Sequence, residues 1–165
     1  MPEVFLGLGS NQSPELHIGN AISALRDRFG EVRLSPIYES EAVGFVGDNF
    51  LNLVARIETA LTIGELHQVL RDIENANGRD RAQARFSGRT LDIDILTYGD
   101  AQGLIEGVQL PRDEVFVNAF VLKPFSDLAP WLRVGDRQQT LAELWQAFDL
   151  GAQRLWQVNK DWPSQ

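Results

Sequence analysis

The sequence predicts an α+β fold with a ferredoxin-like core, in which an antiparallel sheet carries helices on one face. The first observation is the order of the expected elements: strand, helix, strand, strand, helix, strand, as in the split βαβ arrangement. The second is that both expected helices start at residues with good capping chemistry. No repeat, low-complexity tract or linker interrupts the chain. We therefore expect one domain over residues 1–165, with added helices and a strand after the core.

The first half of the core begins with an apolar strand over residues 4–8. Ser13 and Pro14 then provide an N-cap and a first helical residue, and apolar residues follow at helical spacing. Residues 32–40 predict the second strand. Because Pro36 lies within it, we expect an edge position or a bulge there.

The second half of the core starts with residues 50–58, whose alternating pattern predicts a third strand. Thr62 and Glu65 form a capping box at the start of the second helix, and residues 91–96 predict the fourth strand. The remainder of the chain adds three elements: a helix near 113–122, a helix from Thr140 and a strand over 154–158.

The composition is that of an ordinary globular protein, with 44% hydrophobic and 23% charged residues. No apolar run approaches the roughly 20 residues that cross a bilayer, and residues 1–10 do not resemble a signal peptide. We therefore expect a cytoplasmic protein that does not contact membranes. With no cysteine and two histidines, any metal is expected to be bound by oxygen atoms, which favours Mg²⁺ or Mn²⁺.

Charge is distributed unevenly along the chain. The net charge of −8 argues against a nucleic-acid-binding protein, which is usually basic. Yet residues 79–89 contain four arginines and a single acid. A basic patch on an acidic protein indicates a local anionic ligand rather than a long polyanion.

Two carboxylates alternate along the fourth strand. Asp92 and Asp94 are expected on one face of the sheet, while the residues between and beside them pack into the core. Such a pair fits a magnesium site that is completed by water and phosphate oxygens. The alternative is a solvated strand face that carries two acids. The arginines just upstream favour the first interpretation, because they supply donors for ATP phosphates.

The most informative segment is Gly88-Arg89-Thr90-Leu91-Asp92-Ile93-Asp94-Ile95-Leu96. It resembles the signature of the 6-hydroxymethyl-7,8-dihydropterin pyrophosphokinase family, enzymes of folate synthesis. Supporting motifs follow the family's order over residues 3–131: Leu8-Gly9-Ser10-Asn11, Phe50-Leu51-Asn52, Gly78-Arg79 and Ala119-Phe120-Val121-Leu122. A ferredoxin-like core is also the fold of that family.

The resemblance implies an enzyme that uses ATP as co-substrate and two Mg²⁺ ions, and we expect it to be a monomer. The hydroxymethyl oxygen of the dihydropterin would attack the β-phosphorus of ATP, and AMP would leave. Positioning and charge neutralisation would supply most of the catalysis. No side chain stands out as an obligatory general base.

The resemblance also implies roles for individual residues. Asp92 and Asp94 would hold the two Mg²⁺ ions as catalytic residues, together with three arginines that contact or close over the phosphates: Arg79, Arg81 and Arg89. Further ATP contacts are implied for Arg71, Glu74, Arg85, Phe86, Ile95 and Arg112.

On the substrate side, the resemblance implies that Asn52 hydrogen-bonds the pterin ring and that Asp92 also lies at the pterin. Backbone groups from Ser40 to Val43 would complete its polar edge. Phe50 and Phe120 would sandwich the ring. Taken alone, each phenylalanine would instead be interpreted as a core residue.

Two positions depart from the family pattern on the nucleotide side. Arg112 stands where the family usually has histidine, and Asn118 where it commonly has arginine. Arginine still donates to phosphate, but it does not give up a proton near neutral pH. The alternative function is therefore a catalytically weak paralogue that binds pterin or nucleotide. A ferredoxin-like RNA-binding module is a third reading, opposed by the net charge.

Overall fold

The structure is a computed structural model that describes residues 1–41, 48–78 and 91–159. Its main sheet has the strand order β5-β1-β4-β3-β8, with β2 also paired to β4, and the strand pairs in it are antiparallel. The bounds are β1 (Glu3–Ser10), β2 (Arg33–Leu34), β3 (Ile37–Ser40), β4 (Phe50–Glu58), β5 (Asp92–Tyr98) and β8 (Leu155–Val158). The ferredoxin-like α+β fold is thus confirmed, and the expected C-terminal strand extends the sheet beside β3.

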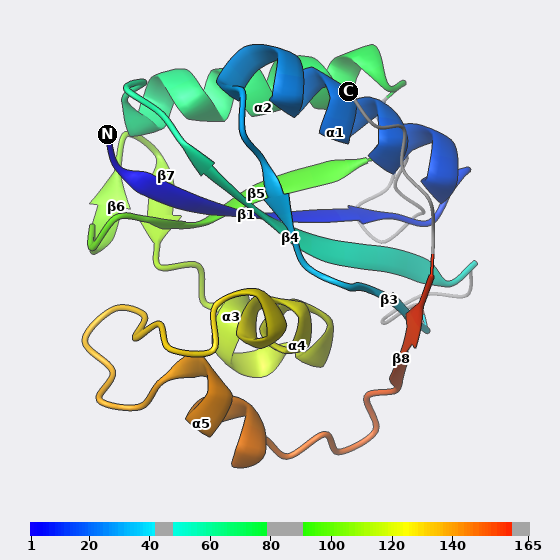
Figure 1. Ribbon diagram of the computed structural model, residues 1–165, viewed down its shortest axis with the longest axis vertical. Helices are drawn as coiled ribbons and strands as arrows, with labels where there is room; N and C mark the ends of the chain where they lie inside the picture. The colour runs from blue at the N-terminus through cyan, green and yellow to red at the C-terminus, as the bar shows by residue number, and fades with distance from the viewer. Residues whose placement is uncertain (42–47, 79–90, 160–165) are drawn as a thin grey trace.

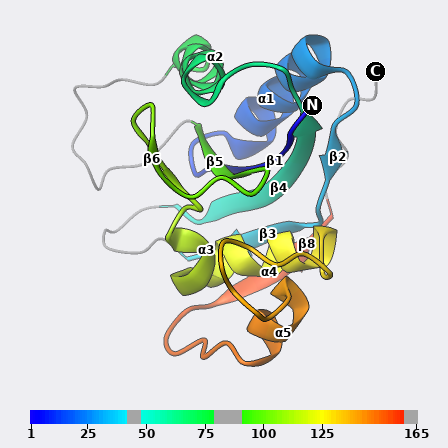
Figure 2. The same cartoon turned by 90° about the vertical axis from the view of Figure 1, so that its left-hand side faces the viewer.

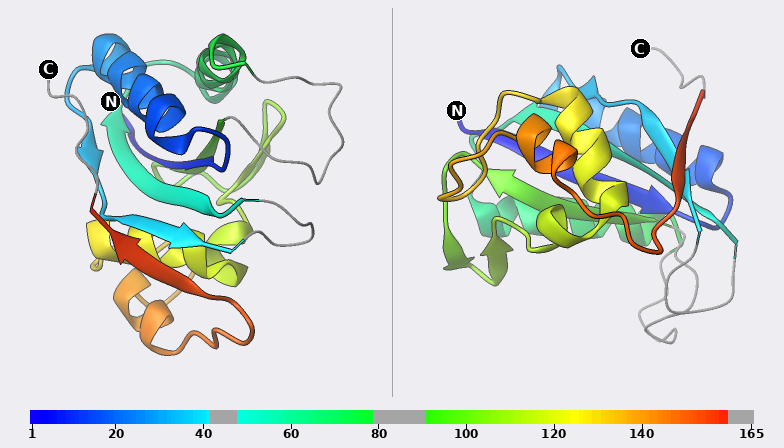
Figure 3. Two further views of the ribbon diagram at one scale, coloured as in Figure 1. Left: turned by 90° about the vertical axis from the view of Figure 1, so that its right-hand side faces the viewer. Right: turned by 90° about the horizontal axis from the view of Figure 1, so that it is seen from below.

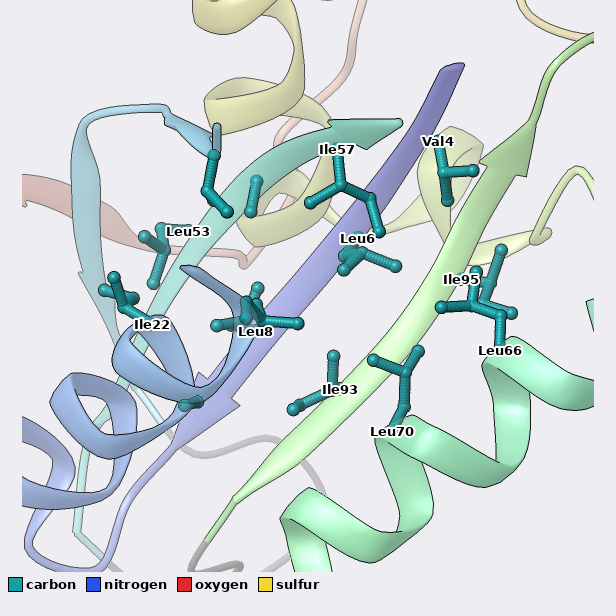
Figure 4. Packing of buried hydrophobic residues seen from close by; sticks show 14 of the residues in the cluster. Val4, Leu6, Leu8, Ile22, Leu53, Ile57, Leu66, Leu70, Ile93 and Ile95 are labelled. Carbon is teal, nitrogen blue, oxygen red and sulfur yellow. The ribbon is translucent and has the colours of Figure 1, made fainter. Parts of the chain in front are cut away.

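Two helices, α1 (Pro14–Phe29) and α2 (Ile63–Ala76), cover one face of the sheet (Figure 1). Alternate residues of the central strands point at them and form the larger core (Figure 4). The capping box of Thr62 and Glu65 is confirmed. The expected cap at Ser13 is wrong, because this residue has φ 44° and its side chain makes no capping hydrogen bond, although Pro14 does open the helix.

The opposite face is covered by α3 (Glu114–Val117) and α4 (Ala119–Leu128), and α5 (Leu141–Gln146) packs on the outer side of α4 (Figure 2). Here Phe5 of β1 packs on Phe125 of α4 with ring centroids 4.9 Å apart. The sequence predicted one helix near 113–122. The structure instead has two, because Asn118 takes an extended conformation with φ −110° and ψ 118° between them.

Two further details differ from the prediction. The second strand is divided into β2 and β3, since Ser35 turns its side chain inward to accept a hydrogen bond from the Val54 amide at 2.8 Å. A hairpin of β6 (Gly103–Ile105) and β7 (Val108–Leu110) was not predicted. Its turn residues Glu106 and Gly107 both have positive φ, as a two-residue hairpin turn requires.

Across the described ranges, no helix is both long and apolar enough to cross a membrane.

Candidate active site

A row of paired residues crosses the sheet on the face turned away from α1 and α2. Tyr38 of β3 pairs with Asn52 of β4, Asn52 pairs with Gly9 of β1, and Gly9 pairs with Asp92 of β5. Paired residues in neighbouring strands put their side chains on the same face. Asn52 and Asp92 are therefore two strand spacings apart, about 10 Å, with only a glycine between them.

The Asn52 side chain leaves no room for a side chain at position 9. A Cβ atom added at this position would lie 2.5 Å from the Asn52 Oδ1 atom. The Asn52 amide therefore leans over the Gly9 backbone, toward the strand that carries Asp92. Asn52 is 9% exposed, and its Nδ2 donates to the Ser40 hydroxyl at 3.5 Å, so the amide is held in this direction. A glycine within a strand often marks such a close approach.

The two carboxylates lie one pleat apart on β5. Asp94 pairs with Gly7 as Asp92 pairs with Gly9, so both carboxylates stand on the same face, roughly 7 Å apart along the strand. Burial raises the pKa of Asp94 to about 7, against the lowering effect of Arg112 and with further raising by Asp92, Glu114 and Glu74. Asp94 is thus a half-buried carboxyl with other acids nearby, where its charged form is disfavoured.

Arg112 is the cation nearest to this charge in the described part of the chain. Its backbone amide donates to the Leu96 carbonyl at 2.9 Å, which fixes it to β5. Its guanidinium lies 2.7 Å from Glu114 Oε1 and 3.6 Å from Asp94 Oδ2. The Arg112 Nε atom is buried and has no hydrogen-bond acceptor among the described residues. Arg112 therefore offsets part of the charge of Asp94 without forming a close ion pair with it.

Glu74 of α2 lies beside β5, the strand that carries Asp92 and Asp94. It is 4% exposed, and its Oε2 atom accepts a hydrogen bond from the Ile93 amide at 2.8 Å. Ile93 separates Asp92 from Asp94, so this bond ties α2 to the strand segment that presents both carboxylates. The resemblance assigned Glu74 to nucleotide contact, and the structure adds this anchoring role.

The aromatic and hydroxyl residues expected at the pterin come from three different elements. Ser40 at the end of β3 pairs with Phe50 at the start of β4, two residues along from the pair of Tyr38 and Asn52 and therefore on the same face. Phe120 is the second residue of α4. Ser40 is buried, whereas Phe50 and Phe120 are half-buried and so keep surface for a ligand.

Other predicted residues are placed differently. The side chain of Ile95 is 3% exposed and packs in the core beneath α2, so only its backbone is available to a nucleotide. Arg71 lies on α2, where its Nε is 3.1 Å from His67 Nε2. Six predicted residues fall outside the described ranges: Val43, Arg79, Arg81, Arg85, Phe86 and Arg89.

The donor set of the site suits a hard divalent cation. Asp92 and Asp94 offer carboxylate oxygens, and a cation would favour the charged form of Asp94 against the burial and the neighbouring acids that raise its pKa. Among the described residues, no group of three or more histidine or acidic side chains is placed to bind a metal. A cation held here would thus keep coordination positions for water and phosphate, which is the habit of Mg²⁺.

Sequence reasoning overlooked several residues that shape the site. Gly7 and Gly9 were available as a signal, because two glycines in an otherwise apolar strand indicate close approach. Glu114 and the partners of Arg112 carried no local signal. The same holds for the Tyr38 hydroxyl, which donates to Asp127 of α4 and ties that helix to β3.

Comparisons with known proteins agree with this arrangement. A family model described as 7,8-dihydro-6-hydroxymethylpterin-pyrophosphokinase matches residues 5–130. The chain is 38% identical over 138 residues to a 2-amino-4-hydroxy-6-hydroxymethyldihydropteridine pyrophosphokinase of Pseudomonas aeruginosa, covering 81% of this chain and 84% of that one. A protein of the same name from Aquifex aeolicus is 33% identical over 132 residues, covering 79% and 82%.

The fold also matches that of larger proteins. The solved HPPK-DHPS of Plasmodium falciparum superposes with a TM-score of 0.68 at 12% identity, covering 88% of this chain and 44% of that one. The present chain therefore spans less than half of that protein, and the likeness concerns the fold alone.

Proposed function

The chain belongs to the 7,8-dihydro-6-hydroxymethylpterin-pyrophosphokinase family, and we propose that the face carrying Asn52, Asp92 and Asp94 is its active site. The enzyme transfers the pyrophosphoryl group of ATP to 6-hydroxymethyl-7,8-dihydropterin in folate biosynthesis. The observation that carries the site assignment is the row from Asn52 across Gly9 to Asp92. It sets an amide that suits a heterocycle about 10 Å from a carboxylate pair that suits a metal-bound triphosphate.

On the nucleotide side, Asp92 and Asp94 would hold two Mg²⁺ ions. When bound, the ions would neutralise charge on the β- and γ-phosphates during transfer. Arg112, fixed beside Asp94, would donate to phosphate oxygens as the nucleotide arrives. Arg79, Arg81 and Arg89 complete the proposed phosphate contacts. Glu74, Arg71, Arg85, Phe86 and the Ile95 backbone are proposed to contact the rest of ATP.

On the pterin side, Phe50 and Phe120 would stack on the two faces of the ring. Asn52 would bind the amide-like edge of the ring, and Ser40 and Val43 would complete that edge through their backbone. With the ring held there, its hydroxymethyl group would extend across Gly9 toward Asp92. Gly9 has no side chain of its own there, and the Asn52 amide that would bind the ring reaches over it.

The reaction joins the hydroxymethyl oxygen to the β-phosphorus and breaks the bond between that phosphorus and the oxygen bridging to the α-phosphate. AMP leaves with that oxygen, and the proton of the hydroxymethyl group is released to solvent. The residues would act by orientation and by charge complementarity, which is how most phosphoryl transfer is accelerated. We further propose that the chain acts as a cytoplasmic monomer, since both halves of this site come from one chain.

The departures at Arg112 and Asn118 favour the catalytically weak paralogue as a second candidate. Arg112 is engaged by Glu114 at 2.7 Å, so part of its charge is already compensated. Asn118 replaces a cation with a neutral side chain at the junction of α3 and α4.

The test is AMP formation from ATP in the presence of the dihydropterin and Mg²⁺, with three variants. Asp94→Ala should lose activity by several orders of magnitude, Asp92→Asn should do the same, and Asp100→Asn in the exposed turn after β5 should match the wild type. Pterin binding without AMP formation by the wild type would replace the kinase with the weak paralogue. Activity that survives in Asp94→Ala would remove the carboxylate pair from the mechanism.

A further inference from the structure

The segment before β8 lies against the part of α4 that carries Phe120. Residues 150–155 lead from α5 into β8, whose first residue, Leu155, pairs with Ser40 of β3. Figure 3 shows β8 running along β3, and α4 contacts β3. This segment lies beyond residues 5–130, the part that the family model matches.

Gln153 connects this segment to the α3–α4 junction through both ends of its side-chain amide. Its Oε1 accepts a hydrogen bond from the Ala119 amide at 2.7 Å, and its Nε2 donates to the Val117 carbonyl at 3.0 Å. The Ala119 amide is one of the first donors of α4, which have no partner within the helix. Asn118, the N-cap residue, provides no side-chain hydrogen bond. Gln153 therefore caps α4 from a position 34 residues further along the chain.

A cavity of about 170 Å³ lies at the same place. Its lining includes Ser40 and Phe120, both assigned above to the pterin. Ala152, Gln153 and Arg154 line it as well. The side chain that caps the first turn of α4 thus also faces the space next to Phe120.

We propose that Gln153 is a positioning residue for the pterin, an inference that rests on the proposed function. Phe120 directly follows Ala119, so the two hydrogen bonds of Gln153 fix the turn from which the Phe120 ring projects. A stacking ring contributes most when its position is set before the ligand arrives, because no ordering is then needed on binding. Both hydrogen bonds of Gln153 go to the backbone of the α3–α4 junction, directly before Phe120, so we expect its main effect on pterin affinity.

The experiment compares Gln153→Ala and Gln153→Glu with the control Gln157→Ala, because Gln157 is an exposed residue of β8. Calorimetry measures the Kd of the dihydropterin and of a non-hydrolysable ATP analogue, and steady-state kinetics measures both KM values and kcat. Gln153→Ala should raise the pterin Kd and KM about 10-fold, the worth of one to two hydrogen bonds. Its ATP-analogue Kd and kcat should change less than about twofold, and Gln157→Ala should match the wild type.

Gln153→Glu keeps the acceptor for the Ala119 amide but loses the donor to the Val117 carbonyl. Its pterin Kd should therefore lie between that of the wild type and that of Gln153→Ala. This variant also serves if Gln153→Ala does not fold. Amide hydrogen exchange of Ala119 should accelerate in Gln153→Ala even without ligand. An unchanged pterin Kd, or an equal loss of ATP-analogue affinity, would overturn the positioning role. A wild type that binds no pterin would overturn the proposed function itself.

Discussion

Removing the charge of Asp94 should stabilise the protein while it abolishes catalysis. In the unfolded chain this carboxyl titrates near its ordinary value, 3.8, whereas in the folded protein burial raises its pKa to about 7. Between these values the folded state binds more protons than the unfolded state. Stability therefore falls as pH rises through this window, and the loss stays constant above it.

The size of the effect follows from the pKa and from the exposure of the side chain. A pKa raised from 3.8 to about 7 corresponds to roughly 4 kcal/mol at about 1.4 kcal/mol per pH unit. The Asp94 side chain keeps 37% of its surface exposed, and water screens part of this cost. We therefore expect Asp94→Asn to raise the free energy of unfolding by about 1–2 kcal/mol at pH 8.

Urea unfolding at pH 8 and pH 4.5, with EDTA present, measures this difference. The gain should be largely lost at pH 4.5, where the wild-type carboxyl is mostly protonated in the folded state. Asp100→Asn serves as the control, because Asp100 is exposed and should show no gain at either pH. The reasoning would be refuted by an Asp94→Asn variant that is less stable than the wild type at pH 8, or that gains equally at both pH values.

Three further outcomes are expected. Gly9→Ala should leave the fold intact but weaken pterin binding about 10-fold by calorimetry. The added Cβ would lie 2.5 Å from the Asn52 Oδ1 atom, so the Asn52 amide would have to move away; unchanged affinity would exclude Asn52 as a pterin ligand. Arg112→Met should tighten Mg²⁺ binding to the free protein several-fold in a fluorescence or calorimetric titration, since a cation 3.6 Å from Asp94 is removed; weaker Mg²⁺ binding would contradict this. Tyr38→Phe should leave kcat unchanged and lower the free energy of unfolding by only about 1 kcal/mol, because Asp127 keeps its ion pair with Lys123 at 2.9 Å. A loss of activity would give the Tyr38 hydroxyl a role in the site.

What the sequence could predict is local in origin. The capping box of Thr62 depends on residues three apart, and the shared face of Asp92 and Asp94 depends only on the two-residue period of a strand. The order of such elements is enough for the ferredoxin-like class, which strand pairing then confirmed.

What the sequence could not predict depends on contacts between distant segments. The expected single helix broke at Asn118, where the Gln153 side chain forms hydrogen bonds with both flanking residues. The wrong cap at Ser13 has a local cause instead, because its backbone takes φ 44°. No periodicity in residues 113–122 reveals a partner 34 positions further on. Likewise, the pairing of Arg112 with Glu114 and Asp94 follows from the fold rather than from spacing.

The geometry around Asp94 explains why a cation at position 112 is compatible with a magnesium site. A guanidinium closer than about 3 Å would form a charge-assisted hydrogen bond and compete directly with the metal. At 3.6 Å, with its other end held by Glu114, Arg112 leaves Asp94 with a pKa of about 7 rather than below its ordinary value. The negative charge of Asp94 is therefore only partly offset by Arg112, and a bound divalent cation would offset the rest. The instability expected of the free protein at pH 8 and its affinity for a divalent cation thus have the same origin.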